Sequence, residues 1–293
     1  YHFALVPNAV IHFGGQSTGK LAPDYITRNQ ELLRQTYAPL GLGERILVRR
    51  WGAHGDLTMA TPALRAVQRQ QPLAHIHVQC HDHAGKVLVG LPYVQGVFTV
   101  VPAGVHYTRA INLNGVYELQ QQHGVYEHPT QAFCRVAEVA YDQQPYDFHI
   151  SDELRAWALD LLRPWAGETL IATGLRSANR PKQNWRASKW RALANELPRG
   201  TFLVAIDHEA RPDFTPVAPL ASDLAFYAHS QVIDLTGQTP SLMHAAALIA
   251  ACQAFVGIDS GLLHVAASQG LPVVNLCAAA PEAARTPLVG ERL

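Results

Sequence analysis

The chain has 293 residues, of which 48% are hydrophobic and 16% charged, and its 23 basic side chains balance 23 acidic ones. A length of this order indicates two domains, because one domain usually has about 100–200 residues. The apolar content is that of a globular protein and excludes an intrinsically disordered chain. No apolar run approaches the ~20 residues of a membrane-spanning helix. The zero net charge argues against binding to nucleic acid through bulk electrostatics.

Cysteine usage points to a reducing compartment. The 4 cysteines lie far apart, at positions 80, 134, 252 and 277, with no Cys-x-x-Cys pair and no secretory leader. Reduced thiols in a cytoplasmic protein are the simpler interpretation.

Strand and helix patterns alternate from residue 45 onward, whereas residues 1–44 give only a weak pattern with a helix-like stretch near 25–37. Apolar residues at helical spacing between Leu57 and Val67 predict a helix, in which Thr61-Pro62 are interpreted as the cap and first-turn proline. Strands are expected at 45–50, 75–80 and 96–101, with a short helix at 85–90. This order predicts a parallel sheet covered by helices.

The second half repeats the alternation. Strands are expected at 169–173, 201–206, 231–235, 254–258 and 272–277, and helices at 187–197, 241–252 and 260–269. An amphipathic helix at 151–162 and a linker at 163–167 lie between the halves. We therefore predict an extension over 1–44, a first Rossmann-like domain over 45–166 and a second over 167–293.

The sharpest local signal runs from Gly257 to His264, with the sequence Gly-Ile-Asp-Ser-Gly-Leu-Leu-His. A strand ends there and a helix opens, so free backbone N–H groups and the positive helix end would face the carboxyl edge of the sheet. Such a turn binds phosphate or pyrophosphate. The alternative is that Asp259 merely caps the helix and that His264 packs.

A second signal is the turn at 52–56 after the first strong strand. Asp56 would lie at the carboxyl end of the sheet, where open α/β domains bind ligands. It could act as a general base on a hydroxyl, or only as a helix cap.

A basic segment follows the strand at 169–173. Between Arg176 and Arg199 the segment contains 7 basic residues and one acidic residue, Glu196. In a neutral protein this surplus indicates a small anionic ligand. A solvated helix face accounts for Arg186, Lys189 and Arg191 better than for Arg180 and Lys182.

Histidines alternate along the strand at 75–80 and its exit loop, where His75, His77, His81 and His83 accompany Cys80 and Asp82. A polar strand face explains this pattern better than a metal site, because ligands two apart without a distant matching pair do not close a tetrahedron. No Gly-x-Gly-x-x-Gly loop and no complete Walker-type loop is present.

Four blocks together carry a family signature. They are the strand at 46–50 with Gly55-Asp56-Leu57 and the helix at 61–66, the stretch 91–98, Lys182 to Trp190, and residues 235–239 with 257–274. These residues resemble glycosyltransferase family 9, whose best-known members are ADP-heptose heptosyltransferases of lipopolysaccharide core assembly. The resemblance implies a GT-B fold, in which two Rossmann-like domains bind the acceptor and the nucleotide sugar.

The resemblance also implies residue roles. Asp56 matches the catalytic base, with His54 and Gly55 in the acceptor-side loop. The donor and its phosphates would be bound by Thr173, Gly174, Arg180, Lys182, Asp259, Ser260, Gly261, Leu262 and His264. The donor's ribose would be bound by Asp207 or Glu209, and Glu209 is the residue predicted for this contact.

These roles imply an inverting glycosyl transfer from a nucleotide diphosphate sugar, ADP-linked on the family's precedent, without a metal or other cofactor. The acceptor side, 111–147, carries no recognisable signature, so a glycan, a protein or a phage nucleic-acid base stays open, and peripheral membrane contact is possible. The alternatives are a nucleotide-sugar-binding or scaffold protein without turnover, and a nucleotide-sugar epimerase.

Overall fold

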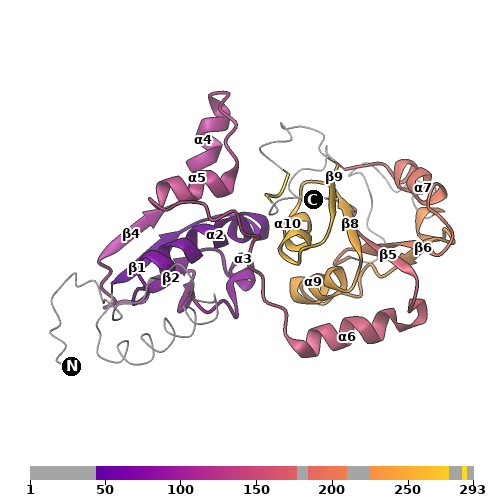
Figure 1. Cartoon of the computed structure of the whole chain (residues 1–293), viewed down its shortest axis with the longest axis horizontal. Helices are drawn as coiled ribbons and strands as arrows, with labels where there is room; N and C mark the ends of the chain where they lie inside the picture. Colours follow the sequence, from indigo (N-terminus) through magenta and orange to yellow (C-terminus); the bar gives the residue numbers. More distant parts are fainter. Residues whose placement is uncertain (1–43, 177–183, 210–224, 277–285, 289–293) are drawn as a thin grey trace, which may run out of the picture. The chain divides into compact units, whose positions relative to one another are not determined.

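Two parallel sheets form the core of the computed structural model, which describes residues 44–176, 184–209, 225–276 and 286–288. The first sheet has the strand order β3-β2-β1-β4 and the second the order β7-β6-β5-β8-β9. Both belong to one compact unit, Glu44–Leu293 (Figure 1). The helix expected near 25–37 lies outside the described residues.

Within the described residues, four short strands build the first sheet. Its strands are β1 (Arg45–Arg49), β2 (His75–Gln79), β3 (Gly96–Phe98) and β4 (Arg109–Asn112). Its helices are α2 (His54–Gln70), α3 (Asp82–Gly85), α4 (Val116–Gln122) and α5 (Pro129–Val136), with a 3-10 turn, η3, at Lys86–Leu88. The helix expected at 85–90 is thus α3 and η3, and the expected strand at 96–101 ends at Phe98. Strand β4 was not predicted, because Ile111 is its only buried residue and no apolar run marks it.

The second sheet follows the expected order of elements. Its strands are β5 (Thr169–Gly174), β6 (Thr201–Ile206), β7 (Val232–Asp234), β8 (Ala254–Gly257) and β9 (Val273–Asn275). Its helices are α6 (Asp152–Leu162), α7 (Ala187–Asn195), α9 (Leu242–Ala250) and α10 (Gly261–Ser268), with a 3-10 turn, η4, at Arg163–Trp165. Among the described helices none is long and apolar enough to cross a membrane.

Helix α2 corrects one expectation. It begins at His54, so Thr61 and Pro62 lie inside the helix and not at its start. Pro62 has no N–H to donate to the carbonyl of Thr58. The hydroxyl of Thr61 donates to that carbonyl instead, at 2.7 Å. The helix therefore passes through the proline without leaving a buried carbonyl unsatisfied.

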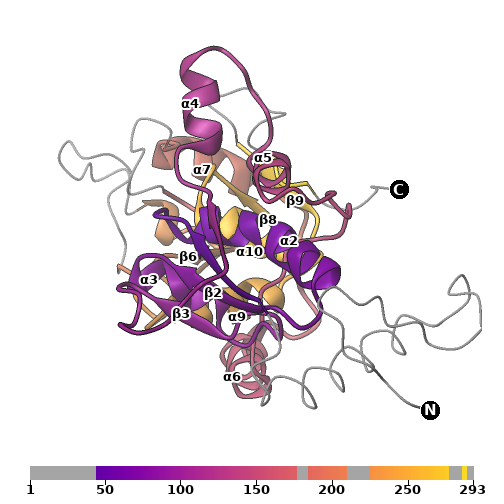
Figure 2. The same ribbon diagram turned by 90° about the vertical axis from the view of Figure 1, so that its left-hand side faces the viewer.

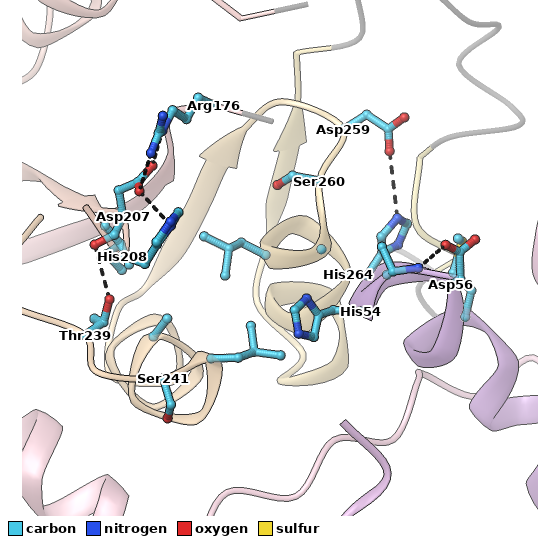
Figure 3. A pocket seen from close by; sticks show the side chains of 18 of the residues that line it. His54, Asp56, Arg176, Asp207, His208, Thr239, Ser241, Asp259, Ser260 and His264 are labelled. Carbon is cyan, nitrogen blue, oxygen red and sulfur yellow. Dashed lines mark hydrogen bonds and ion pairs between the residues drawn. The ribbon is translucent and has the colours of Figure 1, made fainter. Parts of the chain in front are cut away.

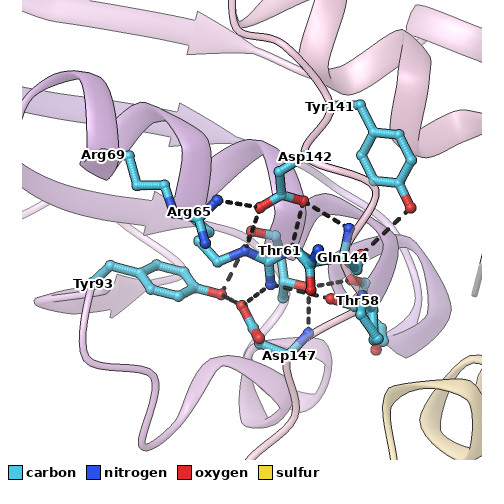
Figure 4. A network of polar contacts seen from close by, with 10 residues as sticks. Thr58, Thr61, Arg65, Arg69, Tyr93, Tyr141, Asp142, Gln144 and Asp147 are labelled. Carbon is cyan, nitrogen blue, oxygen red and sulfur yellow. Dashed lines mark hydrogen bonds and ion pairs between the residues drawn. The ribbon is translucent and has the colours of Figure 1, made fainter. Parts of the chain in front are cut away.

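A polar network fixes the middle of α2 (Figure 4). The guanidinium of Arg65 donates to Asp142, with both donor–acceptor distances 2.9 Å, and also to Asp147. The buried hydroxyl of Tyr93 donates to Asp147 at 2.6 Å. Because these partners hold the segment around 142–147 to α2, the network orients the helix whose first turn carries Asp56.

The N-termini of α2 and α10 lie side by side (Figures 1 and 2). Glycines make this approach possible: a Cβ added to Gly55 would lie 2.9 Å from Cδ2 of His264, and one added to Gly261 would lie 3.4 Å from the backbone nitrogen of Gly55. The contact brings the carboxyl edges of the two sheets to one place.

Candidate active site

A cavity of about 540 Å³ lies where the carboxyl edges of the sheets meet (Figure 3). The first turn of α2 and Tyr117 of α4 line one end. The ends of β5 and β6, at Arg176 and 206–208, and the N-termini of α9 and α10 line the rest. Three helices thus direct their positive ends, with free backbone N–H groups, at one space.

Most of the site residues predicted from the sequence reach this cavity. Its lining includes His54, Gly55, Asp56, Asp259, Ser260, Gly261, Leu262 and His264. Thr173 and Gly174 do not line it: Thr173 is fully buried, and its hydroxyl donates to the carbonyl of Val204 at 3.0 Å. Glu209 is also absent from the lining. Arg180 and Lys182 lie outside the described residues.

Asp56 is held by three donors on two elements. Its Oδ1 accepts from Arg50 and from the Tyr117 hydroxyl, each at 2.6 Å, and its Oδ2 accepts from the Ala53 backbone N–H at 2.8 Å. Burial opposes ionisation of Asp56, but the charge of Arg50 and these hydrogen bonds outweigh it, so its pKa lies below the ordinary value. Asp56 therefore closes the first turn of α2 and presents an ionised carboxylate to the cavity.

The buried guanidinium of Arg50 forms an ion pair with the Asp56 carboxylate. Its side chain is only 2% exposed, and it also donates to the Leu113 carbonyl at 3.0 Å and to Glu118 at 2.6 Å. Burial lowers the pKa of Arg50, but the hydrogen bond to Glu118 and the charge of Asp56 raise it further, so the guanidinium stays charged. Neither Arg50 nor Tyr117 was predicted from the sequence as a site residue. The only local signal was the second arginine at the end of an apolar strand.

The turn before α10 is arranged around a buried histidine. His264 is 3% exposed, and its Nε2 lies 3.9 Å from Oδ1 of Asp259. The ring of Tyr146 lies in an edge contact with it, at 5.8 Å between centroids. The hydroxyl oxygen of Ser260 is buried and has no hydrogen-bond partner among the described residues. The turn therefore offers one carboxylate, one imidazole and one hydroxyl, together with the positive end of α10.

A cluster of charged side chains lies at the end of β6, and it was not predicted from the sequence. Arg176 donates to both carboxylate oxygens of Asp207, at 2.8 and 3.2 Å, and forms an ion pair with Glu209 at 2.6 Å. The hydrogen bond to Asp207 raises the pKa of Arg176 most, with Glu209 adding to it. His208 stands between the same two carboxylates, at 3.1 Å from Asp207 and 3.4 Å from Glu209. The sequence signal that could have indicated this cluster was Arg176, the first residue of the basic segment.

The basic surplus beyond Arg176 lies partly on a helix surface. Arg186, Lys189, Arg191 and Arg199 are exposed, as expected for a solvated face. On β2, His75, His77 and Gln79 are half-buried while Ile76 and Val78 are buried, which matches the polar strand face. In the described ranges no three His, Cys, Asp or Glu side chains are grouped to hold a metal ion.

Several solved structures that match the fold of this chain are named as glycosyltransferases or heptosyltransferases. The glycosyltransferase family 9 protein of Veillonella parvula matches with a TM-score of 0.63 and 20% identity, over 79% of this chain and 80% of that chain. ADP-heptose LPS heptosyltransferase II of E. coli matches with a TM-score of 0.59 and 21% identity, over 84% and 88%. E. coli heptosyltransferase WaaC with ADP matches with a TM-score of 0.56 and 15% identity, over 79% and 86%. These likenesses confirm the expected GT-B fold.

A search of curated proteins found no match. The family model of glycosyltransferase family 9 (heptosyltransferase) matches residues 98–293, which include β5 to β9 and the whole turn before α10. The match covers more than half of the chain, although it leaves out the strand and turn that carry Asp56. The chain belongs to glycosyltransferase family 9, and it is a glycosyltransferase.

Proposed function

We propose that this glycosyltransferase transfers a sugar from an ADP-linked donor to an acceptor hydroxyl, with inversion at the anomeric carbon and without a divalent metal ion. The proposal rests on one observation: the same cavity is lined by an ionised carboxylate, Asp56, and by the N-termini of α9 and α10. The choice of ADP rests on the E. coli heptosyltransferase whose structure contains ADP.

Asp56 is the proposed general base. Inverting transfer needs a base that removes the proton of the acceptor hydroxyl as it attacks the anomeric carbon from the face opposite the leaving group. The hydrogen bonds of Asp56 to Arg50, Tyr117 and the Ala53 backbone fix its position. They also keep it ionised, at the cost of some basicity.

The departing diphosphate would lie at the turn before α10. The free N–H groups of this helix end and the Ser260 hydroxyl can donate to phosphate oxygens, and the helix dipole favours their charge. Arg180 and Lys182 would add positive charge from the basic segment. These groups supply the stabilisation that a divalent cation provides in metal-dependent transferases.

The ribose position changes from Glu209 to the Asp207–His208 pair in this proposal. Glu209 does not line the cavity. Asp207 and His208 do line it, next to the N-terminus of α9. Thr239 donates its hydroxyl to the Asp207 carbonyl at 3.2 Å and so joins α9 to this end of the cavity.

Isothermal titration calorimetry with ADP, GDP, UDP and CDP tests the donor site. ADP is expected to bind with micromolar affinity, equivalent to about −8 kcal/mol. Asp259→Ala and Lys182→Ala should weaken this binding, whereas Lys189→Ala on the exposed face of α7 should not. Failure of every nucleotide to bind would contradict the proposal.

Turnover is tested separately. With a donor and an acceptor preparation, Asp56→Asn should abolish transfer while ADP binding stays within about twofold of the wild-type value. Release of free sugar from the donor alone would instead support the epimerase-type reaction. Nucleotide binding without any turnover in the wild-type protein would support a binding or scaffold function.

A further inference from the structure

A strip of aromatic rings begins at His54, which lines the cavity, and continues along two loops of the first sheet. We call the rings of Trp51, His54, His81 and His83 the ring strip. The centroid distances are 5.5 Å from His54 to His83, 5.5 Å from His83 to His81, and 4.9 Å from His81 to Trp51. The His81 and His83 rings are stacked, with 16° between their planes, and the other two contacts are edge contacts.

The strip lies on the two loops that leave β1 and β2 at the carboxyl edge of the sheet. Nε2 of His54 lies 3.1 Å from the carbonyl oxygen of His83, which joins the two loops. His54 and Asp56 are both in the first turn of α2, and both line the cavity. A ligand on the strip would therefore extend the space in which Asp56 stands.

Core packing does not explain these rings. Trp51 is 39% exposed, and His81 and His83 are exposed as well. His77, on the preceding strand, shows the contrast: its ring packs against Phe98, and its Nδ1 lies 2.9 Å from the Tyr107 hydroxyl. An exposed aromatic surface that continues a cavity indicates a binding surface.

The geometry suits a flat ligand better than a metal ion. In a stacked pair the nitrogen atoms of both rings lie in parallel planes, so their lone pairs do not converge on one point as metal coordination requires. Ring faces and edges, in contrast, accept the flat face of another ring.

Charge decides between the flat ligands. The loop residues 51–54 and 81–83 that carry the strip include no Lys or Arg, and the residue between the two stacked histidines is Asp82, an exposed acid. A nucleic acid needs cations along its backbone for affinity. A neutral sugar needs none, because its C–H face packs on an aromatic ring and its hydroxyls bond to imidazole nitrogens.

We infer that the ring strip binds a neutral pyranose ring of the acceptor and thereby directs one of its hydroxyls toward Asp56. This inference rests on the proposed function, and it identifies the acceptor class as a glycan. Burial and the neighbouring His83 both lower the pKa of His54, so at neutral pH this imidazole is uncharged. Its Nε2–H donates to the His83 carbonyl, which leaves Nδ1 to accept a hydrogen bond from a sugar hydroxyl.

The test observes Trp51 directly in the full chain. Protein labelled with ¹⁵N at its 5 tryptophans gives one indole N–H signal for each, and Trp51→Phe assigns the signal of interest. The probes are the methyl glycosides of glucose, galactose, mannose and N-acetylglucosamine at millimolar concentration, and a thymidine hexanucleotide. Saturable movement of the Trp51 signal by at least one glycoside is expected.

Single-ring variants then locate the binding. His83→Ala should weaken the glycoside about tenfold, the loss expected for one stacked ring. Trp157→Ala is the matched control, because Trp157 makes the same kind of edge contact with His244, at 4.7 Å, on the second sheet's helices. It should leave the glycoside affinity unchanged.

Three results would overturn the inference. They are no glycoside moving the Trp51 signal, wild-type affinity in His83→Ala, and a salt-sensitive shift caused by the hexanucleotide alone. ADP calorimetry on the same samples separates this inference from the proposed function. If ADP binds and no glycoside does, only the ring strip is wrong. If glycosides bind and no nucleotide does, the donor site is wrong and the sugar-binding surface stands.

Discussion

Replacing Tyr117 by Phe is the sharpest test of how Asp56 is kept ionised. The substitution removes only the hydroxyl that donates to Oδ1 of Asp56 at 2.6 Å. The ring remains, so its edge contact with Phe133 at 5.8 Å and its position under the Arg50 guanidinium, 5.1 Å from the ring centre, are preserved. Any change in the pKa of Asp56 then reports the loss of this hydroxyl, which also accepts from Arg50 at 3.2 Å.

The size of the change follows from the partners that are left. A hydrogen bond to a charged group contributes about 1.5–3 kcal/mol, and one pKa unit corresponds to about 1.36 kcal/mol. Loss of the Tyr117 hydroxyl should therefore raise the pKa of Asp56 by about 1–2 units. Arg50 and the Ala53 backbone N–H still bond to the carboxylate, so its pKa should not rise to that of a buried, isolated acid.

The sign of the stability effect follows by linkage. The folded pKa of Asp56 is depressed, so its contribution to the free energy of unfolding is present above the unfolded pKa of about 3.9 and is lost as the pH falls through the folded value. The variant should be less stable than the wild type by about 1–3 kcal/mol at pH near 7. This difference should shrink as the pH falls below the ordinary carboxyl range.

Two measurements check this reasoning. Carboxyl ¹³C titration of labelled aspartates gives the pKa of Asp56, once Asp56→Asn has identified its signal. Urea unfolding at a series of pH values gives the stability difference. Tyr107→Phe is the matched control, because its hydroxyl contacts His77 and not Asp56. An unchanged Asp56 pKa in Tyr117→Phe, or an equal rise in the control, would refute the argument.

Two further predictions concern the rest of the fold. Thr61→Val removes the donor that satisfies the Thr58 carbonyl beside Pro62, so the free energy of unfolding in urea should fall by about 1–3 kcal/mol. The control, Thr108→Val at an exposed site, should change the free energy of unfolding by less than about 0.5 kcal/mol. Equal losses in the two variants would contradict the role given to Thr61. Burial raises the pKa of Cys252 to about 12. At pH near 8, iodoacetamide should therefore leave this thiol unmodified in the native protein and alkylate it after unfolding, as measured by peptide mass spectrometry. Rapid labelling of the native protein would disprove the burial of Cys252.

The parts of the fold that the sequence predicts well are those written in contiguous residues. Ile46 to Val48 form an unbroken apolar run, and the structure buries all of them in β1. The turn from Gly257 to His264 combines strand, turn and helix start within one stretch, and each part forms where expected. Local signals of this kind need no knowledge of partners elsewhere in the chain.

The parts that the sequence does not predict depend on distant partners. Tyr117 donates to Asp56 from 61 positions away, and it reaches the cavity only because β4, which carries no apolar run, adds an edge to the sheet. Arg176 meets Asp207 across 31 positions through the pairing of β5 with β6. Pro62 shows the opposite error: a local rule for helix starts fails because the Thr61 hydroxyl compensates for the missing N–H.

The acids of the cavity raise a physical problem, because Asp56, Asp207 and Asp259 would repel a diphosphate if each presented a full negative charge. Two of them are paired with an arginine, although each arginine also bonds to a second acid, Glu118 or Glu209. Arg50, 2% exposed, bonds to Asp56, and Arg176, 19% exposed, bonds to Asp207. Salt screens such partly buried pairs much less than surface pairs. If a diphosphate binds as proposed, the N-termini of α9 and α10 supply the positive field that it meets, while Asp56 keeps the lone pairs that a proton acceptor requires.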